Sequence, residues 1–338
     1  MTQRRTLLLS ALAVATLTIG DVGHSCPARC RTASARCCRG LTRCCSKPNR
    51  ARVCVRSQDE VWLVSTRHKN CCDVQQLCVR RYCPGRGFVD SSVDEYFAAS
   101  DPQAIVTTFV HGNRVDPGVA GERGLRMYRK IANHACENQR LRHVIWSWCS
   151  GAIRGPLRDA KIKAGRTYFQ SYLLAQFVAR HDSKSRVSLV GFSYGGRIIL
   201  GAQHLLGQGV LCGRSLDTDL CAHTPKTRVV VWAPAMPADW IYPGGKNGRA
   251  FATTDRMLIY YNTRDPALRL YRHKMKESNA HALGFRGVCT NCLGRNASCV
   301  EQHNVVRSIG AHHDWTRYVE SSRIICRTST YALWRSVR

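Results

Sequence analysis

Residues 187–196 of this 338-residue chain, VSLVGFSYGG, decide the fold. An apolar run leads into a turn in which Ser193 lies between Gly191 and Gly195, and the helix-like run RIILGAQHLL follows at 197–206. This pattern predicts a strand, a tight turn and a helix, with the serine on the turn. Such a turn strains the serine backbone and exposes its hydroxyl, while the helix N-terminus favours a nearby anion. Ser193 is therefore the candidate nucleophile.

Five other short runs share the apolar, Val-, Ile- and aromatic-rich character of the run that ends at Phe192. Such runs predict β-strands, and their nearly continuous apolar character is typical of strands covered on both faces of a parallel sheet. The six predicted strands are Glu60–Thr66, Ala104–Val110, His143–Trp148, Val187–Phe192, Arg228–Trp232 and Arg256–Tyr261.

Amphipathic stretches between these strands predict helices at Gly121–Cys136, Arg166–Ala179 and Arg197–Leu206. Alternation of strands and helices indicates the α/β class. We therefore expect a mostly parallel sheet with helices on both faces.

A serine nucleophile needs a base, and in this kind of turn the chain order is serine, then an acid, then histidine. Asp265 follows the predicted strand Arg256–Tyr261 in the segment NTRDP, and Pro266 favours a turn there. Asp265 is the preferred orienting acid. Asp239, which follows the preceding strand, is the alternative.

The candidate base lies in the late segment GAHHDW, residues 310–315. This segment follows the acid and precedes a predicted helix. His313 is the preferred base, and the adjacent His312 remains the alternative.

The segment HGNR at 111–114 follows an early predicted strand. A glycine loop in this place supplies one N–H of an oxyanion hole. We expect the donors to be the backbone N–H groups of Tyr194 and of Asn113 or its neighbour. One such donor contributes about 2.7–4 kcal/mol to the transition state.

From Asp59 to about Ser322 the chain resembles the α/β-hydrolase superfamily. More narrowly, the segments VHGN, GFSYGGR, WAPAMPAD and NTRDPAL resemble a branch of exported bacterial α/β-hydrolases. The resemblance implies a triad of Ser193, Asp265 and His313 and an esterase-like acyl transfer, and it implies no particular substrate. The many cysteines and the N-terminal segment depart from the superfamily pattern.

The N-terminus has the features of an export signal. Arg4 and Arg5 precede the apolar run Leu7–Ile19, and the small residues Gly23 and Ser25 follow it. A mainly apolar run of 13 residues is too short to span a bilayer but typical of a secretory signal peptide. The sequence predicts a signal peptide at residues 1–25, no transmembrane span in the mature chain, and a secreted, periplasmic or cell-envelope location.

Residues 26–58 form a leader with seven cysteines, eight arginines, one lysine and no acidic residue. Such a segment cannot bury a core or contribute to one, so disulfides or a metal would have to order it. It is either a cationic module for an anionic envelope polymer or a leader without a specific ligand. No interleaved aromatics or zinc-finger histidines indicate specific nucleic-acid binding. The hydrolase domain is predicted to span residues 59–338.

The 19 cysteines are consistent with an oxidising compartment, where disulfides persist. Cys212 and Cys221 are candidates for one bridge. Cys289, Cys292, Cys299 and His303 could hold zinc, although disulfides are favoured over a metal. The net charge of +29 indicates either a solvated basic surface or attraction to anionic polymers, lipids or substrates.

Together these features predict an exported serine hydrolase that cleaves carboxylic esters, with a small-molecule or lipid ester as substrate and with no metal or cofactor in the catalytic site. Two alternatives remain open at this point. One is a non-catalytic, cationic envelope-binding protein on a hydrolase scaffold. The other is an acyltransferase or peptidase that uses the same triad.

Overall fold

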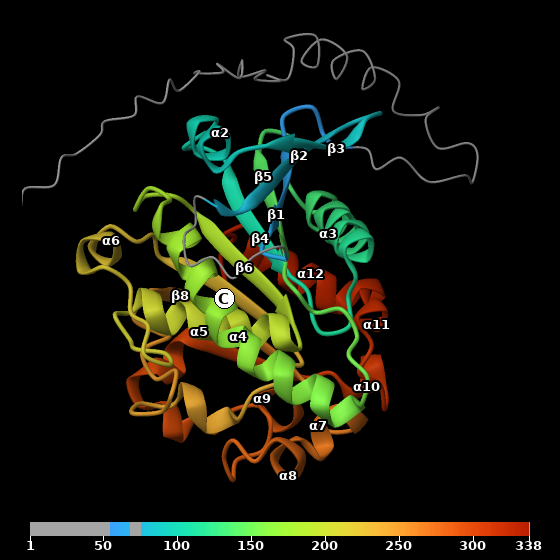
Figure 1. Ribbon diagram of the computed structural model, residues 1–338, viewed down its shortest axis with the longest axis vertical. Helices are drawn as coiled ribbons and strands as arrows, with labels where there is room; N and C mark the ends of the chain where they lie inside the picture. Colours follow the sequence, from blue (N-terminus) through green and yellow to red (C-terminus); the bar gives the residue numbers. More distant parts are fainter. Residues whose placement is uncertain (1–54, 68–75, 338) are drawn as a thin grey trace, which may run out of the picture. The chain divides into compact units, whose positions relative to one another are not determined.

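The computed structural model describes residues 55–67 and 76–337 (Figure 1). Within these residues, nine strands form one sheet in the order β3-β2-β1-β5-β4-β6-β7-β8-β9. The strands are β1 (Glu60–Ser65), β2 (Cys78–Cys83), β3 (Gly87–Ser91), β4 (Ile105–Val110), β5 (Leu141–Ser147), β6 (Val187–Phe192), β7 (Thr227–Trp232), β8 (Thr254–Tyr261) and β9 (Val300–Asn304).

The sheet is mostly parallel, as predicted. Each neighbouring pair from β1 through β5, β4, β6, β7 and β8 to β9 is parallel. Only β2 runs against its two neighbours, β1 and β3. Every residue of the central strands β4, β5 and β6 is buried, which explains why their sequences are almost continuously apolar.

All six predicted strands are present, with ends that differ by up to two residues. The sequence prediction missed β2, β3 and β9. These three strands lie at the two ends of the sheet, and their sequences CVRRYC, GFVDS and VEQHN carry many polar residues. An outer strand that is partly exposed does not need an apolar run, so its sequence signal is weak.

The longer helices are α3 (Pro117–Ala132), α4 (Pro156–Ala179), α5 (Tyr194–Leu206) and α12 (Ser322–Ala332). The shorter ones are α2 (Val93–Ala98), α6 (Thr218–Ala222), η3 (Ala238–Ile241), α7 (Pro266–Arg269), α8 (Tyr271–Met275), α9 (Leu283–Arg286), η4 (Asn291–Cys299), α10 (Val306–Ile309) and α11 (Trp315–Glu320).

Helices cover both faces of the sheet, as predicted (Figure 1). On one face α4 packs on α5, where Ser171 Oγ donates to the Ile198 carbonyl at 3.0 Å. On the other face α3, α11 and α12 pack together, and Trp232 Nε1 of β7 donates to Thr328 Oγ1 of α12 at 3.2 Å. Proline begins both α3 and α4. At this first position of a helix the backbone N–H has no partner within the helix, so proline, which lacks an N–H, loses no hydrogen bond there.

The predicted signal peptide and residues 26–54 of the predicted leader lie outside the described residues. The last leader residues do contact the domain, so the prediction that residues 26–58 cannot contribute to a hydrophobic core is wrong at Val55. Val55 is buried, and the Arg56 guanidinium donates to Asp59 Oδ2 at 2.7 Å and to the Gln139 carbonyl at 2.6 Å. No helix in the described ranges has the length and apolar character needed to cross a membrane.

The expected bridge between Cys212 and Cys221 is absent from the structure, so that prediction is wrong. Cys212 is exposed, whereas Cys221 is buried on α6 and its thiol donates to the Leu205 carbonyl at 3.8 Å. The zinc alternative at Cys289, Cys292, Cys299 and His303 is not assembled either. Within residues 55–67 and 76–337, no three His, Cys, Asp or Glu side chains are grouped as a metal would require.

Candidate active site

The turn between β6 and α5 holds Ser193 in a strained backbone conformation. Its φ is 55° and its ψ is −117°, a region that non-glycine residues rarely adopt. The Ser193 N–H donates to the Trp232 carbonyl of the neighbouring strand at 2.9 Å. The Ser193 carbonyl in turn accepts from the N–H of Gly196 at 3.1 Å. These bonds hold the strained turn at the carboxyl ends of the parallel strands.

Glycine is required on both sides of Ser193. A Cβ on Gly195 would lie 2.0 Å from the Val110 carbonyl oxygen, and a Cβ on Gly191 would lie 2.7 Å from the Gly195 carbonyl carbon. Either contact is far inside van der Waals distance. The two glycines therefore let the start of α5 pass directly over β4, which is the physical reason for the G-x-S-x-G spacing.

His313 lies between Ser193 and Asp265. Its Nε2 is 2.9 Å from Ser193 Oγ, and its Nδ1 is 2.6 Å from Asp265 Oδ2. With the proton on Nδ1, the imidazole donates to the carboxylate and accepts from the serine hydroxyl. The ring also packs against Phe192, with ring centroids 5.0 Å apart. This arrangement can remove a proton from the serine as its oxygen attacks a carbonyl.

Asp265 is fully buried, and its two carboxylate oxygens have separate partners. Oδ2 contacts the imidazole, while Oδ1 accepts the backbone N–H groups of Ala267 at 2.9 Å and Leu268 at 3.0 Å. Asp265 thus caps α7 and orients the histidine at the same time. Because the backbone bonds fix the carboxylate, they also fix where the imidazole points.

The two alternatives from the sequence lie elsewhere. His312 is exposed, and its side chain makes no hydrogen bond to any described residue. Its backbone carbonyl accepts from Asn262 Nδ2 at 3.3 Å. Asp239 lies on η3 and accepts a hydrogen bond from the Ser278 hydroxyl. The structure therefore brings together Ser193, Asp265 and His313, and neither His312 nor Asp239 joins them.

The backbone N–H groups of Asn113 and Tyr194 are the oxyanion donors predicted from the sequence, and Tyr194 directly follows the candidate nucleophile Ser193 at the start of α5. The 111–114 loop lies against Ser193, because a Cβ on Gly112 would be 3.3 Å from the Ser193 Cβ. Within the described ranges neither N–H has a backbone or side-chain acceptor, so both are available to an oxyanion. Arg114, next in the loop, has a φ of 53° that turns the chain sharply there.

Asp159, which is not among the residues predicted from the sequence, holds this loop. The carboxylate is fully buried on the first turn of α4. It accepts hydrogen bonds from Asn113 Nδ2 at 2.9 Å, from Arg114 Nε at 3.0 Å and from Lys163 Nζ at 3.1 Å. Burial alone would raise the pKa of Asp159, but these donors outweigh it and lower the pKa. An acid in a first helical turn is too common to have been recognised in advance.

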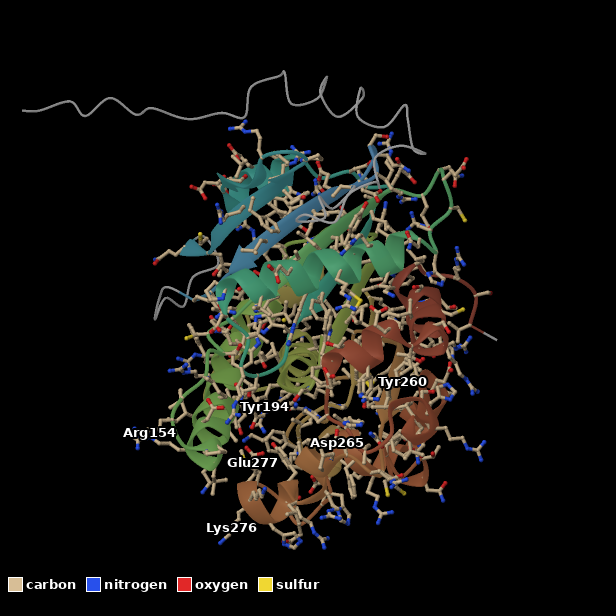
Figure 2. All side chains as sticks on the ribbon, turned by 90° about the vertical axis from the view of Figure 1, so that its right-hand side faces the viewer. Arg154, Tyr194, Tyr260, Asp265, Lys276 and Glu277 are labelled. Carbon is tan, nitrogen blue, oxygen red and sulfur yellow. The ribbon has the colours of Figure 1, made fainter. Side chains whose placement is uncertain are left out.

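Arg197, one turn into α5, is a second residue that the sequence analysis missed. It is buried, and its guanidinium donates to both Glu277 oxygens at 2.7 and 2.8 Å and lies over the Trp240 ring. Burial would raise the pKa of Glu277, but the guanidinium outweighs this and lowers it. The Arg197–Glu277 ion pair ties the segment after α8 to α5, the helix that follows the candidate nucleophile. In Figure 2, the labels of Tyr194, Asp265 and Glu277 lie in the same region of the view.

The order of the parts along the chain decides the fold type. A serine on a strand–turn–helix elbow follows β6, an acid follows β8, a histidine follows β9, and a glycine loop follows β4. The chain has the α/β-hydrolase fold. The resemblance inferred from GFSYGG and HGN is therefore confirmed at the level of the fold.

The known proteins to which this chain is similar are distant structural neighbours. No protein-family model matches the chain, and no curated protein matches it in sequence. Among solved structures, an acyl-protein thioesterase 2 from Zea mays is 12% identical, with a TM-score of 0.34, over 69% of this chain and 96% of that one. An inhibited esterase B from Lactobacillus rhamnosis is 13% identical, with a TM-score of 0.33, over 81% of this chain and 85% of that one.

A truncated carbohydrate esterase from gut microbiota is also similar to this chain, at 12% identity and a TM-score of 0.32, over 69% of this chain and 88% of that one. Likenesses with such low TM-scores carry no argument about activity or substrate. The assignment of the fold rests on the sheet order and the elbow of the chain itself.

Proposed function

We propose that the protein is an exported serine hydrolase that cleaves carboxylic esters through a triad of Ser193, His313 and Asp265. The observation that carries the proposal is the continuous hydrogen-bonded series from Ser193 Oγ through the imidazole to the buried carboxylate, with distances of 2.9 and 2.6 Å. These distances lie within the reach that general-base catalysis needs.

In the proposed reaction, His313 takes the Ser193 proton while the serine oxygen attacks the ester carbonyl. The backbone N–H groups of Tyr194 and Asn113 stabilise the oxyanion of the tetrahedral intermediate. His313 then protonates the leaving alcohol, and an acyl-enzyme remains on Ser193. Water, deprotonated by His313, hydrolyses that acyl-enzyme, and the Asp265 carboxylate stabilises the imidazolium in both steps. The proposed reaction requires no metal or organic cofactor.

The substrate class and location are part of the same proposal. We expect a small-molecule or lipid ester, because the elbow and triad indicate acyl transfer without indicating an acyl group. The signal-like residues 1–25 support export to the periplasm, cell envelope or medium. The cationic residues 26–58 support adhesion to an anionic envelope polymer, which salt would weaken through screening.

Labelling with a fluorophosphonate probe, followed by a panel of soluble esters, tests the proposal. We expect wild-type protein and a Ser298→Ala control to be labelled and to hydrolyse short-chain esters, and Ser193→Ala to do neither. Labelling of Ser193→Ala at wild-type levels would contradict the assignment of the nucleophile. Labelling without ester hydrolysis would favour an acyltransferase or peptidase, and no labelling of the wild type would favour a non-catalytic binding protein.

A further inference from the structure

A cavity of about 940 Å³ lies among β8, β9, α10 and α12, apart from the triad. None of Ser193, Asp265 and His313 lines it. Its volume is in the range of sites that hold small organic molecules, roughly 300–1,000 Å³. The proposed ester hydrolysis gives this space no role.

The buried wall of the cavity is apolar. Tyr260 of β8 and Ile324 of α12 are almost fully buried, and Val305 before α10 is buried beside them. The Tyr260 hydroxyl faces the Ile324 carbonyl at 3.4 Å, so its polar end is directed toward α12. Figure 2 shows Tyr260 on the side of the C-terminal helices, away from Tyr194 and Glu277. The wall therefore suits the apolar body of a ligand.

Glu301 is the only carboxylate among the described residues that line the cavity, and it already has hydrogen-bond partners. It accepts from Arg327 Nε at 2.8 Å, from Tyr331 OH at 2.8 Å and from His303 Nε2 at 2.5 Å. Burial would raise the pKa of Glu301, but these partners outweigh it and lower the pKa to about 2. Glu301 therefore remains ionised and neutralises Arg327.

Two other arginines in the lining, Arg307 of α10 and Arg323 of α12, are different. Both are exposed, and neither guanidinium has a hydrogen bond or ion pair with another residue in the part of the chain that the structure describes. They belong to different helices but border the same cavity. After Glu301 and Arg327 cancel, the lining carries two uncompensated positive charges next to an apolar wall.

We propose that this cavity binds an organic anion, a carboxylate or phosphate carried on an apolar body, with Arg307 and Arg323 on the anionic group and Tyr260, Val305 and Ile324 along the body. Guanidinium groups pair with carboxylates and phosphates through two parallel hydrogen bonds, which suits either anion. Binding here does not depend on the proposed ester hydrolysis.

Isothermal titration with decanoate, decyl phosphate, decanol and acetate tests the proposal on the full chain. The two decyl anions distinguish a carboxylate from a phosphate ligand, decanol lacks the charge, and acetate lacks the apolar body. We expect one decyl anion to bind per chain, and decanol and acetate each to bind at least tenfold more weakly. Equal binding of decanol, or equal binding of acetate, would overturn the proposal.

Three variants separate the cavity from the general positive charge of the protein. Arg307→Gln/Arg323→Gln should weaken binding of the preferred decyl anion at least tenfold. The matched control Arg295→Gln/Arg317→Gln removes the same charge from exposed positions outside the lining and should change binding less than twofold. Thr330→Phe keeps both arginines but places an aromatic ring in the cavity, so it should also weaken binding at least tenfold.

Thermal unfolding establishes that each variant is folded, and Val306→Phe replaces Thr330→Phe if the latter is not. Equal losses in the two arginine pairs would show that overall charge binds the anion. Unchanged binding in the phenylalanine variant would place the ligand elsewhere. Either result would overturn the proposal.

Discussion

The two halves of the candidate active site are built in different ways. The nucleophile half is continuous in sequence, since β6, Ser193 and α5 follow one another without a break. The acid–base half is assembled from two loops, one after β8 and one between α10 and α11, whose members Asp265 and His313 are 48 residues apart. Asn262 joins the two loops through a hydrogen bond from Nδ2 to the Gly310 carbonyl at 2.8 Å.

This difference shows which information each half needs. The elbow depends on local sterics, because the close approach of Gly195 to Val110 excludes any side chain there. The acid–base half depends on the neighbouring positions of β8 and β9 in the sheet, which a single segment of sequence does not specify. The elbow is therefore the half that sequence predicts best, and mutations in the other half are the sharper tests.

The largest expected effect separates the adjacent histidines. His313→Ala should lower kcat for a soluble ester by about 10⁴–10⁶-fold, because the serine loses its base. His312→Ala should change kcat less than about threefold, since its exposed side chain makes no hydrogen bond within the described ranges. Steady-state kinetics with a chromogenic ester measure both.

Thermal unfolding of the two histidine variants is the control, because neither change should alter the Tm by more than a few degrees. A large loss in His312→Ala together with an active His313→Ala protein would reverse the assignment and identify His312 as the base.

Asp265→Asn should have the next largest effect, a fall in kcat of about 10⁴-fold. The amide can present an N–H to His313 Nδ1 and so favour the unproductive tautomer, in which Nε2 carries the proton. Asp239→Asn is the matched control and should retain activity within a few fold, because Asp239 contacts Ser278 and not the histidine. Equal losses of activity in the two variants would contradict the assignment of Asp265 as the residue that orients the histidine.

The sequence predicted the centre of the sheet because burial on both faces leaves a strong apolar signal. The run Val187–Phe192 coincides with β6, and Ala104–Val110 differs from β4 by one residue. The signal is weak where a strand is exposed. In β9, VEQHN, Glu301 is directed toward Arg327 and Tyr331, so an ion pair and hydrogen bonds replace the apolar contacts.

The candidate site was predictable where spacing carries the constraint and ambiguous where only the tertiary structure does. The pattern around Ser193 implies its own turn, and Asp265 follows directly from the end of a recognisable strand. Nothing in the pair HH at 312–313 distinguishes one ring from the other, because the choice depends on how Asn262 holds the loop. Asp159 was missed because its partners Asn113 and Arg114 lie 45 and more residues away.

Asp159→Asn should have an intermediate effect on the nucleophile half. The change weakens the hydrogen bonds that hold the 113–114 loop, so we expect kcat to fall about 10–100-fold, less than removal of an oxyanion donor itself. The KM should change little, because the loop acts mainly in the transition state. The variant also leaves Lys163 buried without its carboxylate, which should destabilise the fold by about 3–5 kcal/mol.

Asp159→Asn/Lys163→Met separates these two effects. Removing the unpaired charge should restore much of the stability, as measured by thermal unfolding, while kcat stays low. Full recovery of kcat in the double variant would show that Asp159 acts on stability alone and does not position the oxyanion loop.

The smallest effect is expected at the N-terminal border, far along the chain from both halves. A chain that begins at Asp59 should still fold and hydrolyse a soluble ester with a kcat within about twofold of the wild type, because every candidate site residue follows that point. It should nevertheless be less stable than a chain that begins at Val55. The shorter chain loses the buried Val55 side chain and the hydrogen bonds of Arg56 to Asp59 and the Gln139 carbonyl.

These contacts should amount to about 1–3 kcal/mol, or several degrees in Tm for a domain of this size. Arg56→Gln in the Val55 chain is the control, because it removes the guanidinium while keeping the buried valine, and it should show only part of the loss. Equal Tm values for the two truncated chains would show that residues 55–58 add nothing to the domain. A large fall in kcat on truncation to Asp59 would mean that the N-terminal border supports one half of the active site.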